Sequence, residues 1–198
     1  QPRGLRDAHP SPARLPTGRS DGGAPPAPAP RRPSGAGALQ RHTLRLLQLL
    51  GVWYGEGHVL VFLDTQQHCD ALFQQLMRAG YPCLSLHGGQ EQMDRDYAIK
   101  DIKKGHRTLM VATSVAGRGL DVPQLKLVVN YNCPNHLEDY VHRVGRTGRA
   151  GRKGTAYTFI SPEEEQYAPD LVKALRDAKK PIPPELQRMS DAFMAKVK

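Results

Sequence analysis

The sequence predicts an α/β fold in which a parallel sheet is covered by helices on both faces. Short apolar runs alternate along the chain with longer stretches whose apolar residues recur at helical spacing. The runs are nearly continuously apolar, which is typical of parallel strands that are buried on both sides. Five such runs are present, at residues 59–63, 83–86, 109–112, 127–131 and 156–160. In sheets of this kind, ligands bind beyond the carboxyl ends of the strands, so we expect one working edge.

The first part of the chain differs in composition from the rest. Residues 1–39 are rich in Pro, Gly, Ala and Arg and contain few large apolar side chains. Because such a segment buries too little surface to offset the loss of chain entropy on folding, we expect it to be disordered. The sequence therefore predicts a folded domain over residues 40–162, followed by a helical extension over residues 163–198.

The helices between the apolar runs are predicted from spacing and from the residues that end helices. A leucine-rich stretch should form a short helix that ends near Gly51, because glycine favours helix ends. Ser161 precedes a helix that should continue to Asp177, and three prolines separate that helix from the last one. The expected helices cover residues 44–51, 69–76, 94–102, 161–177 and 185–196.

The composition of the chain indicates which kinds of partner and site to expect. The net charge of +9 favours a polyanionic partner. The chain has three cysteines, an odd number without the paired spacing of zinc ligands, so we expect reduced, buried thiols in an intracellular protein and no metal site. No apolar run approaches the length of a membrane span, so no membrane contact is expected. The cysteines are Cys69, Cys83 and Cys133.

A cluster of arginines at residues 140–152 is the strongest chemical signal. A helix is predicted just before it, because Asn135 and Glu138 are typical of a helix N-terminus and four apolar residues follow at helical spacing. If that helix continues, His142, Arg146 and Arg149 lie on one stripe, where like charges repel unless they meet an anion. Guanidinium groups suit phosphate, because their planar fork donates two parallel hydrogen bonds. The alternative is a flexible Arg-Gly tract that coats single-stranded RNA. The apolar positions are Leu137, Tyr140, Val141 and Val144.

Several motifs occur in the order found in one family. Residues 142–149 (His-Arg-Val-Gly-Arg-Thr-Gly-Arg) resemble the last motif of superfamily-2 helicases in its DEAD-box form. Residues 59–65, 86–89, 92–95, 112–122 and 129–134 resemble the preceding motifs of the second RecA-like domain of that family, and the likeness covers roughly residues 44–160. Residues 81–83, 130–136 and 154–160 are similar to a subgroup that acts in pre-mRNA splicing at branch-site recognition.

The resemblance implies roles for individual residues. The RNA sugar-phosphate backbone would be bound by Thr65, Gly88, Gln92, Arg95 and Thr113, a contact with little sequence preference. The nucleotide would be bound by Gly119, Asp121, Arg146 and Arg149, with the two arginines and His142 acting in ATP hydrolysis. Contacts with the first RecA-like domain would be made by Arg118, His142 and Arg143, and the last two would also bridge to the motif around Arg118. Strand preference for the threonines and local ion pairs for Arg95 and Arg118 remain open as structural alternatives.

Two departures and two absences accompany the resemblance. Ser114 stands where the family often has Asp, and Gly117 where it often has Ala. Glycine should soften the local helical turn by up to about 1 kcal/mol. The sequence contains neither a Gly-x-x-x-x-Gly-Lys-Ser/Thr loop nor an Asp-Glu-Ala-Asp motif. By the resemblance, the phosphate-binding loop and the ligands of the Mg²⁺ that accompanies ATP belong to the first domain, so this chain alone should be inactive.

Two functional hypotheses follow from different classes. In the first, the chain is the C-terminal half of an ATP-dependent RNA helicase, nuclear, with RNA, the first RecA-like domain and a spliceosomal ribonucleoprotein as partners. In the second, it is a non-catalytic RNA-binding or scaffold protein without the ATP-binding domain. A Walker-type loop encoded upstream of Arg41 would discriminate between them.

Overall fold

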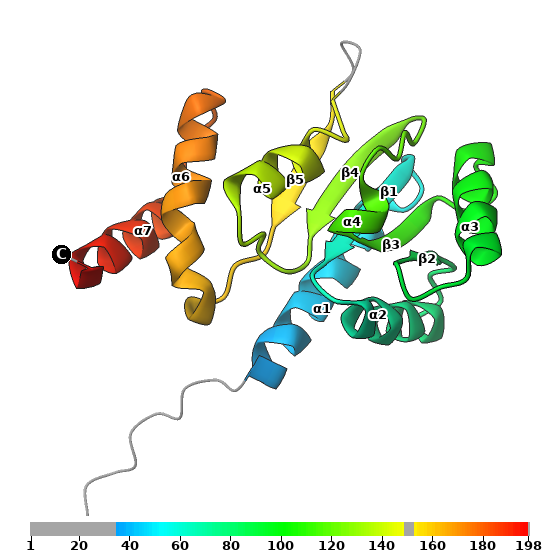
Figure 1. The fold of residues 1–198 in the computed structure, drawn as a ribbon. Coiled ribbons are helices and arrows are strands. Elements are labelled where there is room, and N and C mark those ends of the chain that lie inside the picture. The colour runs from blue at the N-terminus through cyan, green and yellow to red at the C-terminus, as the bar shows by residue number, and fades with distance from the viewer. Residues whose placement is uncertain (1–34, 149–152, 198) are drawn as a thin grey trace, which may run out of the picture. The chain divides into compact units, whose positions relative to one another are not determined.

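The computed structural model describes residues 35–148 and 153–197, which form a parallel five-stranded sheet with helices on both faces (Figure 1). All four pairs of neighbouring strands are parallel, and the strand order is β2-β3-β1-β4-β5. The predicted fold is confirmed. The strands are β1 (His58–Leu63), β2 (Leu84–Leu86), β3 (Leu109–Thr113), β4 (Leu125–Asn130) and β5 (Thr155–Thr158).

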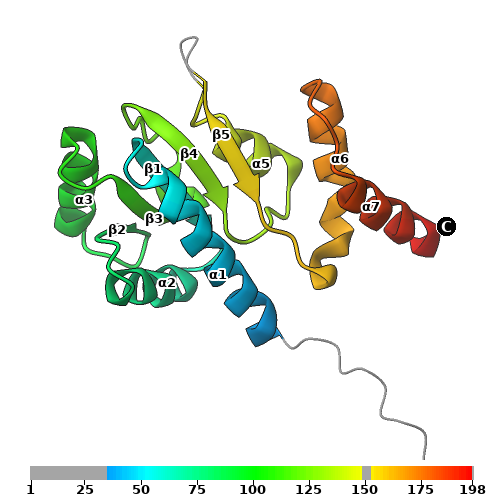
Figure 2. The ribbon, with the colours of Figure 1, turned by 180° about the vertical axis from the view of Figure 1, so that it is seen from behind.

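Helices α1 (Gly35–Trp53) and α2 (Gln66–Arg78) cover one face, and Figure 2 shows α1 crossing in front of the sheet. Leucines of both helices pack on the odd-numbered residues of β1. Helix α1 begins before the expected domain start and continues past Gly51. That glycine is exposed, and its cost of about 1 kcal/mol is smaller than the gain from the buried leucines around it. The disorder predicted for residues 1–39 is wrong for residues 35–39, which belong to α1, and residues 1–34 lie outside those described.

Helices α3 (Gln92–Lys104), α4 (Ser114–Gly117) and α5 (Leu137–Val144) lie on the other face (Figure 1). The second core forms there, between the even-numbered residues of β1 and buried residues of α3. The three free cysteines are buried, as predicted, and burial raises the pKa of each thiol to about 12. No helix in the described part of the chain has the length and apolarity needed to cross a bilayer.

The segment after β5 forms a short 3₁₀ helix and two α-helices. Residues Pro162–Tyr167 are 3₁₀-helical, followed by α6 (Ala168–Asp177) and α7 (Pro184–Val197). The predicted single helix over 161–177 is thus divided in two, although its start is as expected: Ser161 and Glu164 form a capping box. At the other end, Lys196 Nζ contacts both carboxylate oxygens of Glu165 at 2.7 and 2.8 Å, which ties α7 to the 3₁₀ helix.

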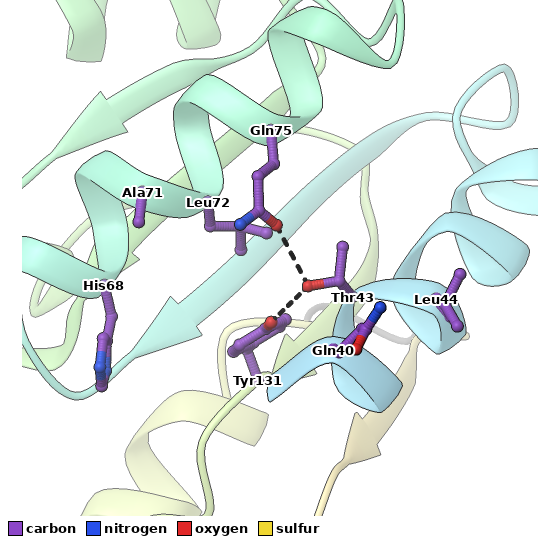
Figure 3. A pocket seen from close by; sticks show the side chains of 8 residues that line it. All are labelled: Gln40, Thr43, Leu44, His68, Ala71, Leu72, Gln75 and Tyr131. Carbon is purple, nitrogen blue, oxygen red and sulfur yellow. Dashed lines mark hydrogen bonds between the residues drawn. The ribbon is translucent and has the colours of Figure 1, made fainter. Parts of the chain in front are cut away.

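A groove of about 460 Å³ separates α1 from α2 near the end of β4 (Figure 3). Polar side chains bridge it: Thr43 Oγ1 donates to Gln75 Oε1 at 3.2 Å and lies 2.7 Å from the Tyr131 hydroxyl. These contacts fasten α1 to α2 and to the segment after β4. We therefore assign the groove to the packing of α1 against the rest of the domain, not to ligand binding.

Candidate functional site

Three of the five predicted RNA-binding residues follow neighbouring strands at one edge of the sheet. Thr65 comes just after β1, Gly88 just after β2, and Thr113 ends β3. Because the strands are parallel and adjacent, their carboxyl ends meet at that edge. The Thr65 hydroxyl caps α2 by accepting from the His68 backbone N–H at 3.1 Å, which leaves its own proton available to a phosphate oxygen. Thr113 is buried, so the exposed contact groups here are Thr65 and the Gly88 backbone.

The loop after β2 is held by a buried histidine to which the sequence motifs assign no role. His87 Nδ1 accepts from the Gly89 N–H at 3.2 Å, so the ring proton resides on Nε2, which donates to Asp70 at 2.9 Å. A side chain at Gly89 would collide with Gln66, which follows Thr65. Because this contact is with the end of an exposed, flexible side chain, a larger residue at Gly89 would displace Gln66 rather than the loop, and Gly88 beside it is exposed.

Gln92 and Arg95, the other two predicted RNA-binding residues, contact each other in the first turns of α3. Arg95 donates to Gln92 Oε1, and Gln92 Nε2 donates to Asp96 Oδ1 at 2.8 Å. The Arg95 Nε atom is buried without a hydrogen-bond partner. The expected alternative, an ion pair between Arg95 and a neighbouring aspartate, is not formed within the described residues. The Arg95 charge is thus not neutralised by a carboxylate among the described residues, which favours an anion as its partner.

Arg143 lies inside the domain, where it makes the expected contact with the motif around Arg118 through Ser114, while its contact with the first RecA-like domain stays a prediction. It is 5% exposed, and of the eight residues of α5 it alone is buried. Its Nε donates to Ser114 Oγ at 2.7 Å, and its Nη2 lies 2.8 Å from Asp139 Oδ2. Its Nη1 donates to the Asn132 carbonyl at 3.3 Å, and its Cζ lies 5.5 Å from the Phe62 ring centre. Burial lowers the pKa of Arg143, and the Asp139 carboxylate opposes that shift.

Ser114 completes this arrangement by donating to Asp139 Oδ2 at 2.9 Å. Asp139, on α5, therefore supplies the carboxylate that the family often carries at position 114. The result is a connection between α4, which follows Thr113, and α5, which precedes Arg146. The elements next to the two predicted sites are thus joined through the hydrogen bonds of Ser114 with the Arg143–Asp139 pair of α5.

The arginine segment is not one continuous helix, so the predicted stripe of His142, Arg146 and Arg149 is wrong. Helix α5 begins after His136, not Asn135, and ends at Val144. The next two turns are tighter, with Arg146 N–H bonded to the Arg143 carbonyl at 3.2 Å. His142 is exposed on α5, and Arg146 is half-buried beyond its end. Arg149 lies outside the described residues.

The loop after α5 is fastened to the opposite end of β4 from the RNA edge. Thr147 Oγ1 donates to the carbonyl of Leu125, the first residue of β4, at 2.8 Å. Gly119 has a φ of +73°, and both it and Asp121 are exposed on the connection that leads into β4. The predicted nucleotide-binding residues therefore lie on two adjoining connections across the face that carries α4 and α5. The expectation of a single working edge holds for the RNA set alone.

Gly117 has a packing role, which differs from the expected softening of the helical turn. A Cβ at this position would lie 2.5 Å from Phe62 Cε1, and Phe62 is among the largest fully buried side chains. The glycine makes room for the ring on which Arg143 stacks. The expectation that it loosens α4 is therefore replaced by a packing role.

The remaining interdomain candidate, Arg118, is exposed, and no ion pair joins it to Asp121 within the described residues. A pocket of about 490 Å³ lies beside it, lined by Ser114, Asp139 and Arg143 among others. Two apolar residues, Val115 on α4 and Val141 on α5, are exposed on the same two helices. Over residues 35–148 and 153–197, no group of three or more His, Cys, Asp or Glu side chains is arranged to hold a metal ion.

Comparisons with known proteins agree with this architecture. Residues 42–151 match the family described as the helicase conserved C-terminal domain. DEAD-box ATP-dependent RNA helicase 42 of Oryza sativa subsp. japonica is 61% identical over 154 residues, which are 78% of this chain and 15% of that protein. The pre-mRNA-processing ATP-dependent RNA helicase prp5 of Aspergillus niger is 54% identical over 160 residues, covering 78% of this chain and 14% of that protein. The chain thus spans about a seventh of the length of these curated relatives.

Solved structures give the same result. The crystal structure of the yeast DEAD-box splicing factor Prp28 superposes with a TM-score of 0.70 at 28% identity, over 77% of this chain and 34% of that chain. The E. coli DEAD-box protein SrmB, bound to regulator of ribonuclease activity A, superposes with a TM-score of 0.62 at 34% identity, over 75% of this chain and 87% of that one.

Proposed function

This chain belongs to the DEAD-box family of RNA helicases, as their conserved C-terminal helicase domain, and on that premise we propose that it binds the RNA backbone and completes the ATPase site of an ATP-dependent RNA helicase. The observation that carries the proposal is the pair of hydrogen bonds that Ser114 forms with Arg143 and Asp139, because they join α4, which follows Thr113, to α5, which precedes Arg146. The residues proposed to contact RNA and those proposed to contact the nucleotide are then connected through α4 and α5.

On the RNA side, the groups at the carboxyl edge are suited to phosphate and sugar rather than to bases. They are a threonine hydroxyl, the glycine backbone and an arginine that forms no ion pair within the described residues. Such contacts position a strand without reading its sequence. Arg95→Ala should therefore weaken binding to all homopolymers alike, measured by fluorescence anisotropy, and a changed preference among homopolymers would contradict backbone recognition.

On the nucleotide side, Gly119 and Asp121 would meet the ribose, and Arg146 and Arg149 the terminal phosphates. Arginine at this place spreads positive charge over the transferring phosphoryl group, so it stabilises the transition state more than bound ATP. His142 and Arg118 would contact the first RecA-like domain, with Val115 and Val141 as apolar neighbours in that contact. Arg143 would act by holding α5 in place from inside.

The test is RNA-dependent ATP hydrolysis after a DEAD-box first domain is supplied, fused or in trans. Arg146→Ala and Arg149→Ala should each lower single-turnover hydrolysis by roughly 10³-fold, whereas lysine at either position should restore little. Arg176→Ala, on the exposed side of α6, is the matched control and should leave the rate unchanged. Unchanged rates in both arginine variants would remove their catalytic assignment. Absence of any hydrolysis with retained RNA binding would favour the non-catalytic RNA-binding protein.

We further propose a place in pre-mRNA splicing and in the nucleus, with ATP and Mg²⁺ bound between this domain and the first one. The support is that similar proteins bear the names pre-mRNA-processing helicase and splicing factor. Association of the epitope-tagged protein with spliceosomal RNA in nuclear extract tests it, and recovery with cytoplasmic ribosomal RNA alone would refute it.

A further inference from the structure

The outer face of α3 carries an exposed pair of large side chains that no role assigned above uses. Met93 is 80% exposed and Tyr97 is 66% exposed, whereas Ala98 and Ile102 on the opposite side of the helix are buried. All seven tyrosines lie in the described residues, and the only other exposed one, Tyr157, is 36% exposed. An aromatic side chain this open to water is a candidate contact for a ligand.

Two lysines continue the same face. Met93, Tyr97, Lys100 and Lys104 follow at intervals of four, three and four residues, so they form one stripe along α3. Both lysines are exposed, and neither forms an ion pair within the described residues. The carboxylates nearest in sequence have other partners: Asp96 accepts from Gln92, and Asp101 pairs with His106 at 3.0 Å.

We propose that this stripe is a second RNA-contact surface, on which a base stacks on Tyr97 while Lys100 and Lys104 bind the adjoining phosphates. An aromatic ring beside unpaired cations is the arrangement that holds single-stranded nucleic acid without sequence preference. The stripe begins one residue after Gln92, and α3 rises about 18 Å from Gln92 to Lys104. A strand that leaves the carboxyl edge can therefore continue outward along α3 (Figure 1). The inference rests on the proposed RNA binding and extends it to nucleotides flanking that edge.

The lysines favour RNA over a protein partner. A docked amphipathic helix would use the Met93–Tyr97 pair but would gain nothing from two unpaired lysines unless it brought acidic residues. The net charge of +9 over the whole chain also attracts polyanions.

The experiment measures binding of the 198-residue chain to a fluorescein-labelled oligouridylate of about twenty nucleotides. Tyr97→Ala should weaken binding by roughly fivefold to a hundredfold, and Tyr97→Phe should retain the affinity, because stacking needs only the ring. Lys100→Ala combined with Lys104→Ala should flatten the slope of log K against log salt by about 1.4, since each phosphate contact on a single strand contributes about 0.7. The matched controls, Tyr157→Ala and Lys173→Ala, should leave both quantities unchanged. In a 5-iodouridine oligonucleotide, photo-crosslinking should place an adduct on Tyr97.

The outcomes separate this inference from the proposed function. If Arg95→Ala weakens binding while the Tyr97 and lysine variants bind as wild type, the stripe is not an RNA surface although the edge is. If the stripe variants weaken binding while Arg95→Ala does not, the inference stands and the edge assignment fails. Binding without any adduct on α3, together with unchanged variants, would point to a protein partner and overturn the inference.

Discussion

Replacing Gly117 by alanine distinguishes two opposing effects on stability. Helix propensity alone favours alanine by about 1 kcal/mol. The structure opposes this, because the new Cβ would lie 2.5 Å from Phe62 Cε1 in a fully buried ring. Overpacking of a core costs about 1–3 kcal/mol. The net expectation for Gly117→Ala is a destabilisation of about 1 kcal/mol, which corresponds to a melting temperature lower by about 3 °C.

The assay is urea denaturation of four proteins that make a double-mutant cycle: wild type, Gly117→Ala, Phe62→Leu and the double variant. If the clash decides the sign, alanine should stabilise the Phe62→Leu background and destabilise the wild type, with a coupling energy of at least about 1 kcal/mol. Gly51→Ala is the matched control, because Gly51 is an exposed residue of α1 where an added Cβ would meet no atom within 4 Å. It should stabilise by up to about 1 kcal/mol. Equal stabilisation by Gly117→Ala in both backgrounds would refute the packing argument.

Three further predictions concern the buried ion pair, a histidine and the thiols. Arg143→Met should destabilise by about 3 kcal/mol in urea, because it leaves the Asp139 carboxylate, 14% exposed, without its partner. Adding Asp139→Leu should recover part of the loss, and simple additivity would contradict the pairing. Burial lowers the pKa of His42 below 6.5, so the unfolded state binds more protons there and stability should fall as pH drops from 6.5. His42→Leu should remove that part of the pH dependence of the melting temperature, and an unchanged profile would count against it. The three cysteines should react with a thiol reagent at pH 8 only as fast as the domain unfolds, so a rapid phase in the native protein would contradict their burial.

The strands and their parallel direction could be predicted because strands buried on both faces consist of continuous apolar runs, which are visible in the sequence. Each predicted run overlaps an observed strand, and the residues expected after β1 and β2 lie at the expected edge. The end of α5 could not be predicted from the spacing of apolar residues. The helix ends at Val144, and from Gly145 onward the chain forms tighter turns. A Cβ there would lie 2.9 Å from the Val141 carbonyl, a contact that spacing does not encode.

The positions of the charged residues were harder to predict than those of the apolar ones. Arg143 was expected at a contact with the first RecA-like domain because its place in the family motif implied that role, yet it is the buried residue of α5. Its burial depends on Asp139, Ser114 and the Phe62 ring, which come from three separate segments. The serine that departs from the family pattern was the available signal, since a missing carboxylate must be supplied elsewhere if the arginine stays charged.

The order of the strands has a consequence for how the domain behaves at high concentration. The two outer strands, β2 and β5, are also the shortest, with three and four residues. An edge strand has unpaired backbone N–H and C=O groups to which a strand of another chain can bind. The number of these groups increases with the length of the edge strand. Pro82, just before β2, has no N–H to contribute to such pairing. The longer apolar strands β1, β3 and β4 lie inside the sheet, where each is paired on both sides. Another copy of the domain can therefore pair only with the short edge strands.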